Sequence, residues 1–323
     1  MERVAVIEAT GGPEVIRWRD MALPPPGPGE VRLRHGAVGL NFIDTYHRGG
    51  LYPVPLPSGL GLEAAGTVEA VGEGVAGWRV GERAGGFSGP LGAYATARNI
   101  AAEQLVRLPD AVDDATAAAI LLKGATAAML VEQCARIEPG QTVLVTAAAG
   151  GVGHLLVGWL KAVGATVIGT VGTPAKAERA RAGGADHVLL SSEDIAARVR
   201  EITGGAGVPV VLDGVGQATW GPALASASRR GLIVSYGNAS GPVEGVALGQ
   251  LARHGSLFVT RPTLFDYAVT AAERQALADR VFAMLANGAI QPEIGQRFAL
   301  GDAAAAHRAL EAGGTQGSTI LMP

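Results

Sequence analysis

A run of small residues between two apolar segments constrains this chain more than any other feature. Residues 142–146 (TVLVT) lead into Ala147-Ala148-Ala149-Gly150-Gly151-Val152-Gly153, and residues 152–163 have the length and composition of a helix. The run has the G-x-G-x-x-G spacing, with Ala148 in the first position. Small residues let a pyrophosphate approach the backbone, and the last glycine lets the helix pack on the strand. We therefore predict a dinucleotide-binding turn, with an ordinary strand–turn–helix connection as the alternative.

Strands and helices alternate around this turn. Apolar strand patterns occupy residues 165–170, 188–190, 208–212, 232–235 and 257–260, and residues 174–182 read as a helix with Pro174 in its first turn. Continuous apolar strands separated by helices indicate a parallel sheet covered on both faces. The predicted fold class is α/β, with a Rossmann dinucleotide-binding domain over residues 123–264.

The rest of the chain has a different character. Residues 1–122 contain short alternating strands, such as 31–34 and 66–72, punctuated by proline and glycine, so we predict a second, β-rich domain. A helix is expected to begin near Asp113. The tail from residue 265 contains helical patterns at 271–287 and 303–312 and a strand at 318–321. We expect residues 265–323 to return to the β-rich domain and a cleft to separate the two domains.

Composition narrows the possible functions. The chain is 48% hydrophobic and 17% charged, and its formal net charge is −3 with no cluster of basic residues, which argues against nucleic-acid binding. Its most apolar stretch, residues 143–172, is interrupted by glycines in a turn pattern, so we expect no membrane span. Cys134 is the only cysteine, so no intrachain disulfide can form and a cytoplasmic location is expected.

The end of the second Rossmann strand distinguishes the two nicotinamide cofactors. NAD-binding proteins place an acidic residue there for the ribose 2′-hydroxyl. This chain reads Gly172-Thr173 instead and continues to Lys176, one of only three lysines. A lysine and hydroxyls without a carboxylate favour the 2′-phosphate of NADPH. The alternative is that Lys176 only solvates its helix.

Together, these motifs resemble the zinc-free, zeta-crystallin-like quinone oxidoreductases of the medium-chain dehydrogenase/reductase superfamily. The resemblance runs through GGPEV (11–15), GLNFIDTY (39–46), GGLYP (49–53), LKGAT (122–126), AAAGGVG (147–153), DGVG (213–216), VSYGN (234–238), VTRP (259–262) and QGST (316–319). It implies a GroES-like catalytic domain beside the Rossmann domain, and a homodimer with the strand at 257–260 as a plausible seam.

The resemblance also implies the site residues. Asn41, Tyr46 and Tyr52 would line the active-site cleft. The cofactor would meet Asn41, Thr126, Gly150, Gly151, Val152, Gly172, Thr173, Lys176, Gly216, Asn238, Phe258, Val259, Thr260 and Ser318. Close relatives often carry a Tyr-Arg or Tyr-Ser pair near the adenosine, whereas this chain reads VLLSS at 188–192, so an arginine clamp is absent there.

No metal is expected. Zinc-dependent relatives hold catalytic zinc with a Cys and a Gly-His-Glu segment, and the corresponding positions here carry Asn41 and Leu62. The six histidines show no metal-ligand spacing, and catalytic zinc needs three protein ligands.

The predicted reaction is zinc-independent, NADPH-dependent reduction of a quinone. Quinones are electrophilic enough to accept a hydride when hydrogen-bond donors face the developing oxyanion. We expect Tyr52 to contact the substrate oxygen, Asn41 to position the nicotinamide ribose or the substrate, and Asp44 to order its loop. Local packing is the alternative for either tyrosine. An enone or alkenal reductase is the second candidate, and an NADPH-binding redox sensor or structural protein with little activity is the third.

Overall fold

The computed structural model describes residues 1–323, which divide into two compact units. The first comprises Met1–Ala125, Ala268–Phe282 and Pro292–Pro323, and the second comprises Thr126–Tyr267 and Ala283–Gln291. The domain boundaries predicted from the sequence, after residues 122 and 264, stay a proposal about independently folding domains.

The second unit is built on a six-stranded parallel sheet, as the sequence predicted. Its strand order is β10-β9-β8-β11-β12-β13. The strands are β8 (Thr142–Val145), β9 (Thr166–Val171), β10 (His187–Leu190), β11 (Val208–Asp213), β12 (Ala227–Ser235) and β13 (Phe258–Thr260). Because β8 lies between β9 and β11, the chain reverses its direction of sheet growth next to the glycine turn, and ligands bind at such a switch point in open α/β sheets.

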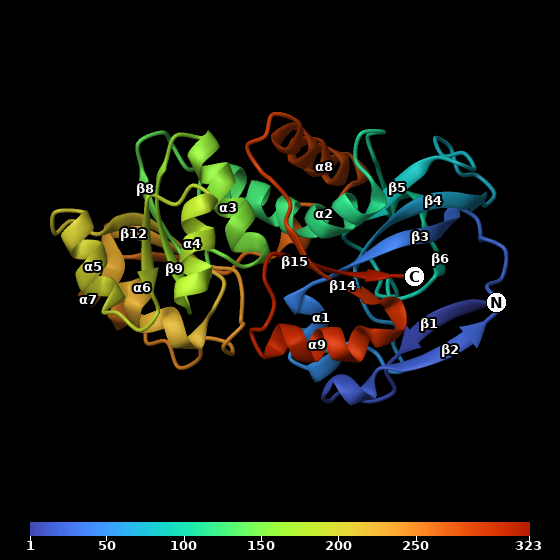
Figure 1. Cartoon of the computed structure of the whole chain (residues 1–323), viewed down its shortest axis with the longest axis horizontal. Helices are drawn as coiled ribbons and strands as arrows, with labels where there is room; N and C mark the ends of the chain where they lie inside the picture. Colours follow the sequence, from blue (N-terminus) through green and yellow to red (C-terminus); the bar gives the residue numbers. More distant parts are fainter. The chain divides into compact units, whose positions relative to one another are not determined.

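Helices pack against this sheet (Figure 1). They are α3 (Gly151–Ala162), α4 (Pro174–Ala182), α5 (Ile195–Ile202), α6 (Trp220–Ser226) and α7 (Gly249–Arg253). One buried cluster joins Leu144, Ile168 and Val211 of the strands to Val199 of α5 and Leu224 of α6. This apolar cluster fixes the strands against the helices that cover the sheet.

The first unit contains a seven-stranded sheet with the order β14-β15-β3-β4-β5-β7, and β6 pairs with β3. The strands are β3 (Glu30–Leu40), β4 (Glu63–Val71), β5 (Arg83–Gly86), β6 (Ala97–Ala101), β7 (Val106–Arg107), β14 (Ile294–Ala299) and β15 (Ser318–Met322), beside a two-stranded sheet of β1 (Glu2–Val6) and β2 (Arg17–Met21). The last strand, β15, pairs antiparallel with β3, so the C-terminal tail belongs to this sheet.

The four other α-helices are α1 (Phe42–Gly49), α2 (Asp114–Ala128), α8 (Ala271–Ala286) and α9 (Ala303–Glu311). The helix expected near Asp113 is confirmed, because the Asp113 carboxylate accepts a hydrogen bond from the Thr116 N–H at 2.6 Å, as an N-cap does. A π-helical turn, Met129–Cys134, continues α2. The combined segment Asp114–Cys134 is the one helix long and apolar enough to cross a membrane, but 78% of its apolar window is buried inside the structure, as in the core helix of a soluble protein.

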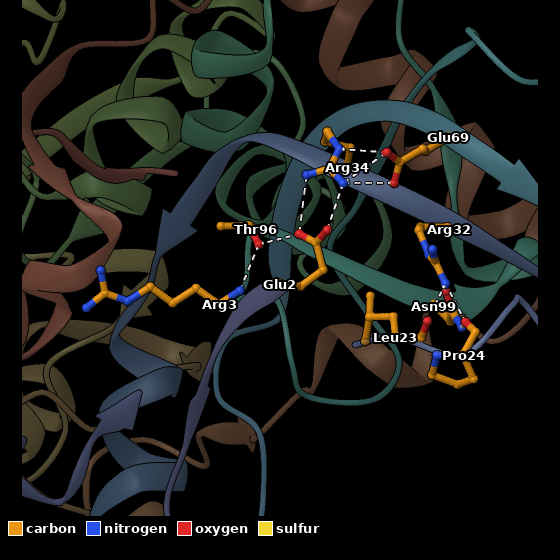
Figure 2. A network of polar contacts seen from close by, with 9 residues as sticks. All are labelled: Glu2, Arg3, Leu23, Pro24, Arg32, Arg34, Glu69, Thr96 and Asn99. Carbon is orange, nitrogen blue, oxygen red and sulfur yellow. Dashed lines mark hydrogen bonds and ion pairs between the residues drawn. The ribbon is translucent and has the colours of Figure 1, made fainter. Parts of the chain in front are cut away.

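A polar network ties the N-terminal strand to the sheet (Figure 2). The guanidinium of Arg34 on β3 contacts the carboxylates of Glu2 on β1 and Glu69 on β4 at 2.8 and 2.9 Å. The Thr96 hydroxyl also donates to Glu2 at 2.5 Å. The hydrogen bond from Arg34 lowers the pKa of Glu2 to about 2. The network therefore links β1, β3 and β4 of the first unit through paired charges.

Candidate active site

The glycine turn joins β8 to α3 in the second unit. Ala147 adopts a left-handed φ of 51°, and a side chain on Gly153 would collide with the Ala147 carbonyl. The α3 helix begins after Gly150, whose extended backbone caps it without a side-chain hydrogen bond. Its first N–H groups are thus left for a ligand, and the positive end of a helix dipole attracts phosphate. This geometry fits the predicted roles of Gly150, Gly151 and Val152 toward a pyrophosphate.

A cavity of about 290 Å³ lies beside this turn, within the second unit. It opens where β8, β9 and β11 end, and its polar lining comes from Thr146, Thr170, Ser191 and Thr219. No acidic residue lines it. Of the predicted cofactor residues, Gly172 contributes to the wall, and a Cβ there would meet open space. The threonines and Ser191 were not nominated from the sequence, although their places at strand ends are where such ligands bind.

Thr173 and Lys176 lie at the start of α4, next to this cavity's Gly172 wall. The Thr173 hydroxyl accepts a hydrogen bond from the Lys176 backbone N–H at 3.3 Å and caps the helix. The Lys176 side chain is half-buried. The structure therefore gives Thr173 a capping role in addition to the cofactor role predicted for it.

Asp213, at the end of β11, organises the loop that carries Gly216. Its buried carboxylate accepts from the hydroxyls of Thr146 and Thr219 at 2.8 and 2.7 Å, and from the Val215 and Gly216 N–H groups. Gly216 has a φ of 96°, and a side chain there would collide with the carbonyl of Gly241. The loops after β11 and β12 therefore pack closely, which brings the predicted residues Gly216 and Asn238 together.

The other predicted nicotinamide-side residues are dispersed. Phe258, Val259 and Thr260 form the edge strand β13, where Phe258 is 59% exposed and Val259 is 39% exposed. Thr126 is buried in α2. Ser318 belongs to the first unit, where its hydroxyl donates to the Ala119 carbonyl at 2.8 Å.

The first unit brings the three predicted catalytic residues into one segment. Asn41 is the N-cap of α1, which the sequence reading did not identify, and Tyr46 lies on that helix. The rings of Tyr46 and Tyr52 meet edge to face with centroids 5.2 Å apart, and the Tyr52 N–H donates to the Tyr46 carbonyl at 3.1 Å. Both tyrosines are half-buried. Helix α1 therefore fixes the tyrosine pair relative to Asn41.

A buried carboxylate, that of Glu63 at the start of β4, supports Asn41. Its Oε2 accepts from the Asn41 side-chain amide at 2.8 Å and lies 3.4 Å from the ammonium of Lys123. Its Oε1 accepts from the Leu122 N–H at 2.7 Å. Glu63 is fully buried, and Lys123 is 5% exposed. Neither residue was predicted from the sequence as a site residue, because one acid and one lysine do not form a recognisable motif.

Asp44, three residues into α1, holds the Asn41 backbone. Its Oδ2 accepts from the Asn41 N–H at 2.9 Å and from the Tyr94 hydroxyl at 3.0 Å, while Oδ1 has no hydrogen-bond partner. Burial is the main cause that raises the pKa of Asp44 from 3.8 to about 7. The carboxyl group thus orders the start of α1, the role expected for it.

A series of hydrogen bonds connects Asp44 through Tyr94 and His307 to Arg48. Tyr94 also contacts Nε2 of His307 at 3.0 Å, and the Arg48 guanidinium donates to Nδ1 of His307 at 2.9 Å. Because Arg48 can only donate, Nε2 must carry the imidazole proton and donate it to the tyrosine oxygen. Burial lowers the pKa of His307 to about 3, so the ring is neutral. Arg48 ends the chain in an ion pair with Glu311 at 2.5 Å.

The side chains include no group of three or more His, Cys, Asp or Glu residues that could hold a metal ion. Asn41 donates to Glu63, and Leu62 is buried in the apolar core. The residues present here therefore make hydrogen bonds and ion pairs with one another.

The raised pKa of Asp44 leads to a prediction about stability. At pH 5 the folded state holds a proton that the unfolded chain has lost, and raising the pH through 7 leaves a buried charge. Between pH 5 and 8, the free energy of unfolding of the wild type should therefore fall by about 2 kcal/mol relative to Asp44→Asn. Urea unfolding at four pH values measures this difference. Parallel pH dependences of the two proteins would contradict the prediction, and the buried histidines cancel because both proteins contain them.

Comparisons with known proteins agree with this architecture. Residues 27–110 match the family model described as alcohol dehydrogenase GroES-like domain, and residues 151–286 match zinc-binding dehydrogenase. A quinone oxidoreductase of Pseudomonas aeruginosa is 53% identical over 98% of both chains. The structure of Escherichia coli quinone oxidoreductase complexed with NADPH superimposes with a TM-score of 0.97 at 45% identity, over 99% of this chain and 100% of that one.

A 2-haloacrylate reductase of Burkholderia sp. is 43% identical over 100% of this chain and 99% of its own. The resemblance inferred from the motifs and the predicted fold class are thus both confirmed. The chain belongs to the quinone oxidoreductase family of the medium-chain dehydrogenase/reductase superfamily.

Proposed function

We propose that this protein is an NADPH-dependent quinone oxidoreductase that works without zinc. The observation that carries the proposal is the cavity beside the glycine turn, whose lining contains hydroxyl groups and no carboxylate. An NAD site would place an acid there for the ribose 2′-hydroxyl. The relatives named quinone oxidoreductase and the NADPH-complexed neighbour support the same conclusion.

The residues of the second unit would hold NADPH mainly through backbone. Gly151 and Val152 would offer N–H groups to the pyrophosphate, while Gly150, whose own N–H donates to the Ala147 carbonyl at 2.8 Å, would lie beside it. Gly172, Thr173 and Lys176 would face the adenosine phosphate. Gly216, Asn238, Phe258, Val259 and Thr260, with Thr126 and with Ser318 of the first unit, receive the nicotinamide half. When bound, NADPH supplies the hydride that reduces the substrate.

The first unit would supply the groups that act on the substrate. Reduction of a quinone places negative charge on oxygen, and preorganised donors stabilise that charge. The hydroxyl of Tyr52, packed against Tyr46, donates to the substrate oxygen. Asn41 holds the nicotinamide ribose or the substrate, with its amide oriented by Glu63.

A second candidate is supported by the 2-haloacrylate reductase relative. An α,β-unsaturated carbonyl compound, like a quinone, accepts hydride at a carbon conjugated to oxygen. The same tyrosines and Asn41 would serve either substrate, because both reactions develop an oxyanion.

Assays with a panel of acceptors test the proposed function. Purified protein should oxidise NADPH with 1,4-quinones at a higher kcat/KM than with α,β-unsaturated ketones or 2-haloacrylate, measured by the absorbance of NADPH. The reverse order would favour the second candidate. Tight NADPH binding without turnover on any acceptor would overturn both and favour a redox sensor or structural protein.

The cofactor assignment predicts the effect of Lys176→Ala. Removing an ammonium that binds the 2′-phosphate should weaken NADPH binding by about tenfold or more, because a hydrogen bond to a charged group contributes about 1.5–3 kcal/mol. The affinity for NADH should stay unchanged, because NADH has no 2′-phosphate. Fluorescence titration measures both constants. Lys161→Ala is the matched control, since the Lys161 ammonium is already paired with Asp186 at 2.8 Å. Equal weakening of the two cofactors would remove the 2′-phosphate role.

We also propose that the enzyme is a cytoplasmic homodimer joined through β13. This strand ends the six-stranded sheet, has no neighbour on its outer side, and exposes Phe258 and Val259. Pairing with a second copy would cover that edge. Sedimentation velocity should give a dimer for the wild type and a monomer for Phe258→Glu, with Val80→Glu, at another exposed apolar residue, as control. A monomeric wild type would reject the seam.

A further inference from the structure

Lys123 is a buried cation with unused hydrogen-bonding capacity. Its side chain is 6% exposed, and the contact of its ammonium with Glu63 at 3.4 Å is its only hydrogen bond or ion pair. An ammonium carries three N–H donors, so two of them have no acceptor within the protein. Buried charges in proteins are normally fully hydrogen-bonded because desolvation is costly. The two remaining donors are therefore available to an oxygen atom of a ligand.

Glu63 and Asp44 are the charged groups that face this ammonium. Glu63 is already saturated, since the Asn41 amide shares its Oε2 with Lys123 and the Leu122 N–H occupies its Oε1. Asp44 on α1 is close enough for the charge of Lys123 to lower its pKa against the larger effect of burial. Lys123 and Asn41 thus share Oε2 of Glu63, and Asn41 caps the helix that carries Tyr46.

We propose that Lys123 is a catalytic residue that hydrogen-bonds the acceptor oxygen and protonates it as the acceptor is reduced. The proposal rests on the proposed function, because it assigns the charge-stabilising group of that same site. Glu63 acts as a positioning residue. Its Oε2 fixes the Asn41 amide and the Lys123 ammonium on one oxygen, so substrate positioning and charge stabilisation share one anchor.

The proposed step transfers a hydride from NADPH and a proton from Lys123 to the acceptor. When bound, NADPH would supply a hydride, so its nicotinamide C4–H bond would break and NADP⁺ would remain. The hydride would form a new bond to the conjugated acceptor, and a π electron pair of the acceptor would move onto the oxygen that Lys123 contacts. An N–H bond of Lys123 then breaks, and its proton forms the O–H bond of the product. The neutral amine regains a proton from solvent, so the net reaction consumes one acceptor, one NADPH and one proton.

A phenol that changes colour on ionisation tests the site without turnover. We would mix 4-nitrophenol with the full chain at a pH where the free phenol is half ionised, both without cofactor and with saturating NADP⁺, and record the phenolate absorbance. Wild-type protein should bind the phenolate form preferentially. Lys123→Met should abolish this enrichment, Lys123→Arg should retain it, and Lys161→Met should match the wild type. No enrichment in wild type, or equal enrichment in Lys123→Met, would overturn the proposal.

Folding is controlled separately, because Lys123→Met leaves the Glu63 carboxylate without a cation. If Lys123→Met does not fold, as judged by circular dichroism, the double variant Glu63→Gln/Lys123→Met removes both charges and takes its place. The double variant should also lose phenolate enrichment. Retained enrichment in a folded double variant would reject the role of Lys123.

Kinetics separate failure of this proposal from failure of the proposed function. Lys123→Met should lower kcat for quinone reduction by about 10²–10³-fold, as expected for loss of one oxyanion donor, with unchanged NADPH affinity. Tyr52→Phe should also lower kcat but should keep part of the phenolate enrichment, because the charge of Lys123 remains. If wild type reduces quinones and Lys123→Met equals it, the Lys123 assignment fails and the function stands. If wild type reduces no acceptor while enrichment depends on Lys123, the function fails and the anion site stands.

Discussion

The buried carboxylate of Glu63 is the interaction on which the first unit's site depends. It joins three elements, because it starts β4, accepts from the residue that caps α1, and accepts from the backbone of α2. A side chain at Gly39 on β3 would collide with this carboxylate and with the Ala118 carbonyl, so the glycine is needed for the approach. Removing one partner of such a buried group costs more than its net contribution to stability. The position of Asn41 is therefore fixed by the fold of the whole unit.

Asp44, Lys123 and Arg48 are further buried charged residues of the first unit. Asp44 and Glu63 are fully buried acids, and Lys123 and Arg48 are nearly buried cations. The Arg48 guanidinium donates to the neutral His307 and forms an ion pair with the partly exposed Glu311. Neither contact joins it directly to Asp44. The neutral His307 and Tyr94 then connect Arg48 to Asp44 by hydrogen bonds of fixed direction. Lys123, by contrast, is paired only with Glu63, on the same oxygen that accepts from Asn41.

The features that could be predicted from the sequence are those whose signals come from residues close together in the chain. The strand β8, the glycine turn and α3 were readable because their signals lie within about 20 residues, and the bounds of α4 were predicted in full from Pro174 and its helical composition. Helix α5 was missed although Asp194 caps it and Ile195, Val199 and Ile202 recur at helical spacing. The network of Asp44, Tyr94 and His307 was not predictable, since Tyr94 and His307 are 213 residues apart and meet only through the packing of α9 in this unit. The contact between Glu63 and Lys123 was not predictable for the same reason, because the two residues are 60 positions apart.

The proposed site residues of the two units differ in how easily they can be recognised in the sequence. In the proposed site, the second unit would present mostly backbone N–H groups and small hydroxyls to the cofactor. Such a site needs glycines at fixed spacing, which can be recognised in a sequence. The first unit presents side chains whose orientation comes from buried partners distant in sequence. A change of substrate between quinones and haloacrylates can then arise in the first unit alone, around α1 and its tyrosine pair, without altering the glycine turn. A shared fold and cofactor site therefore leave the acceptor to be decided by a few side chains in the first unit.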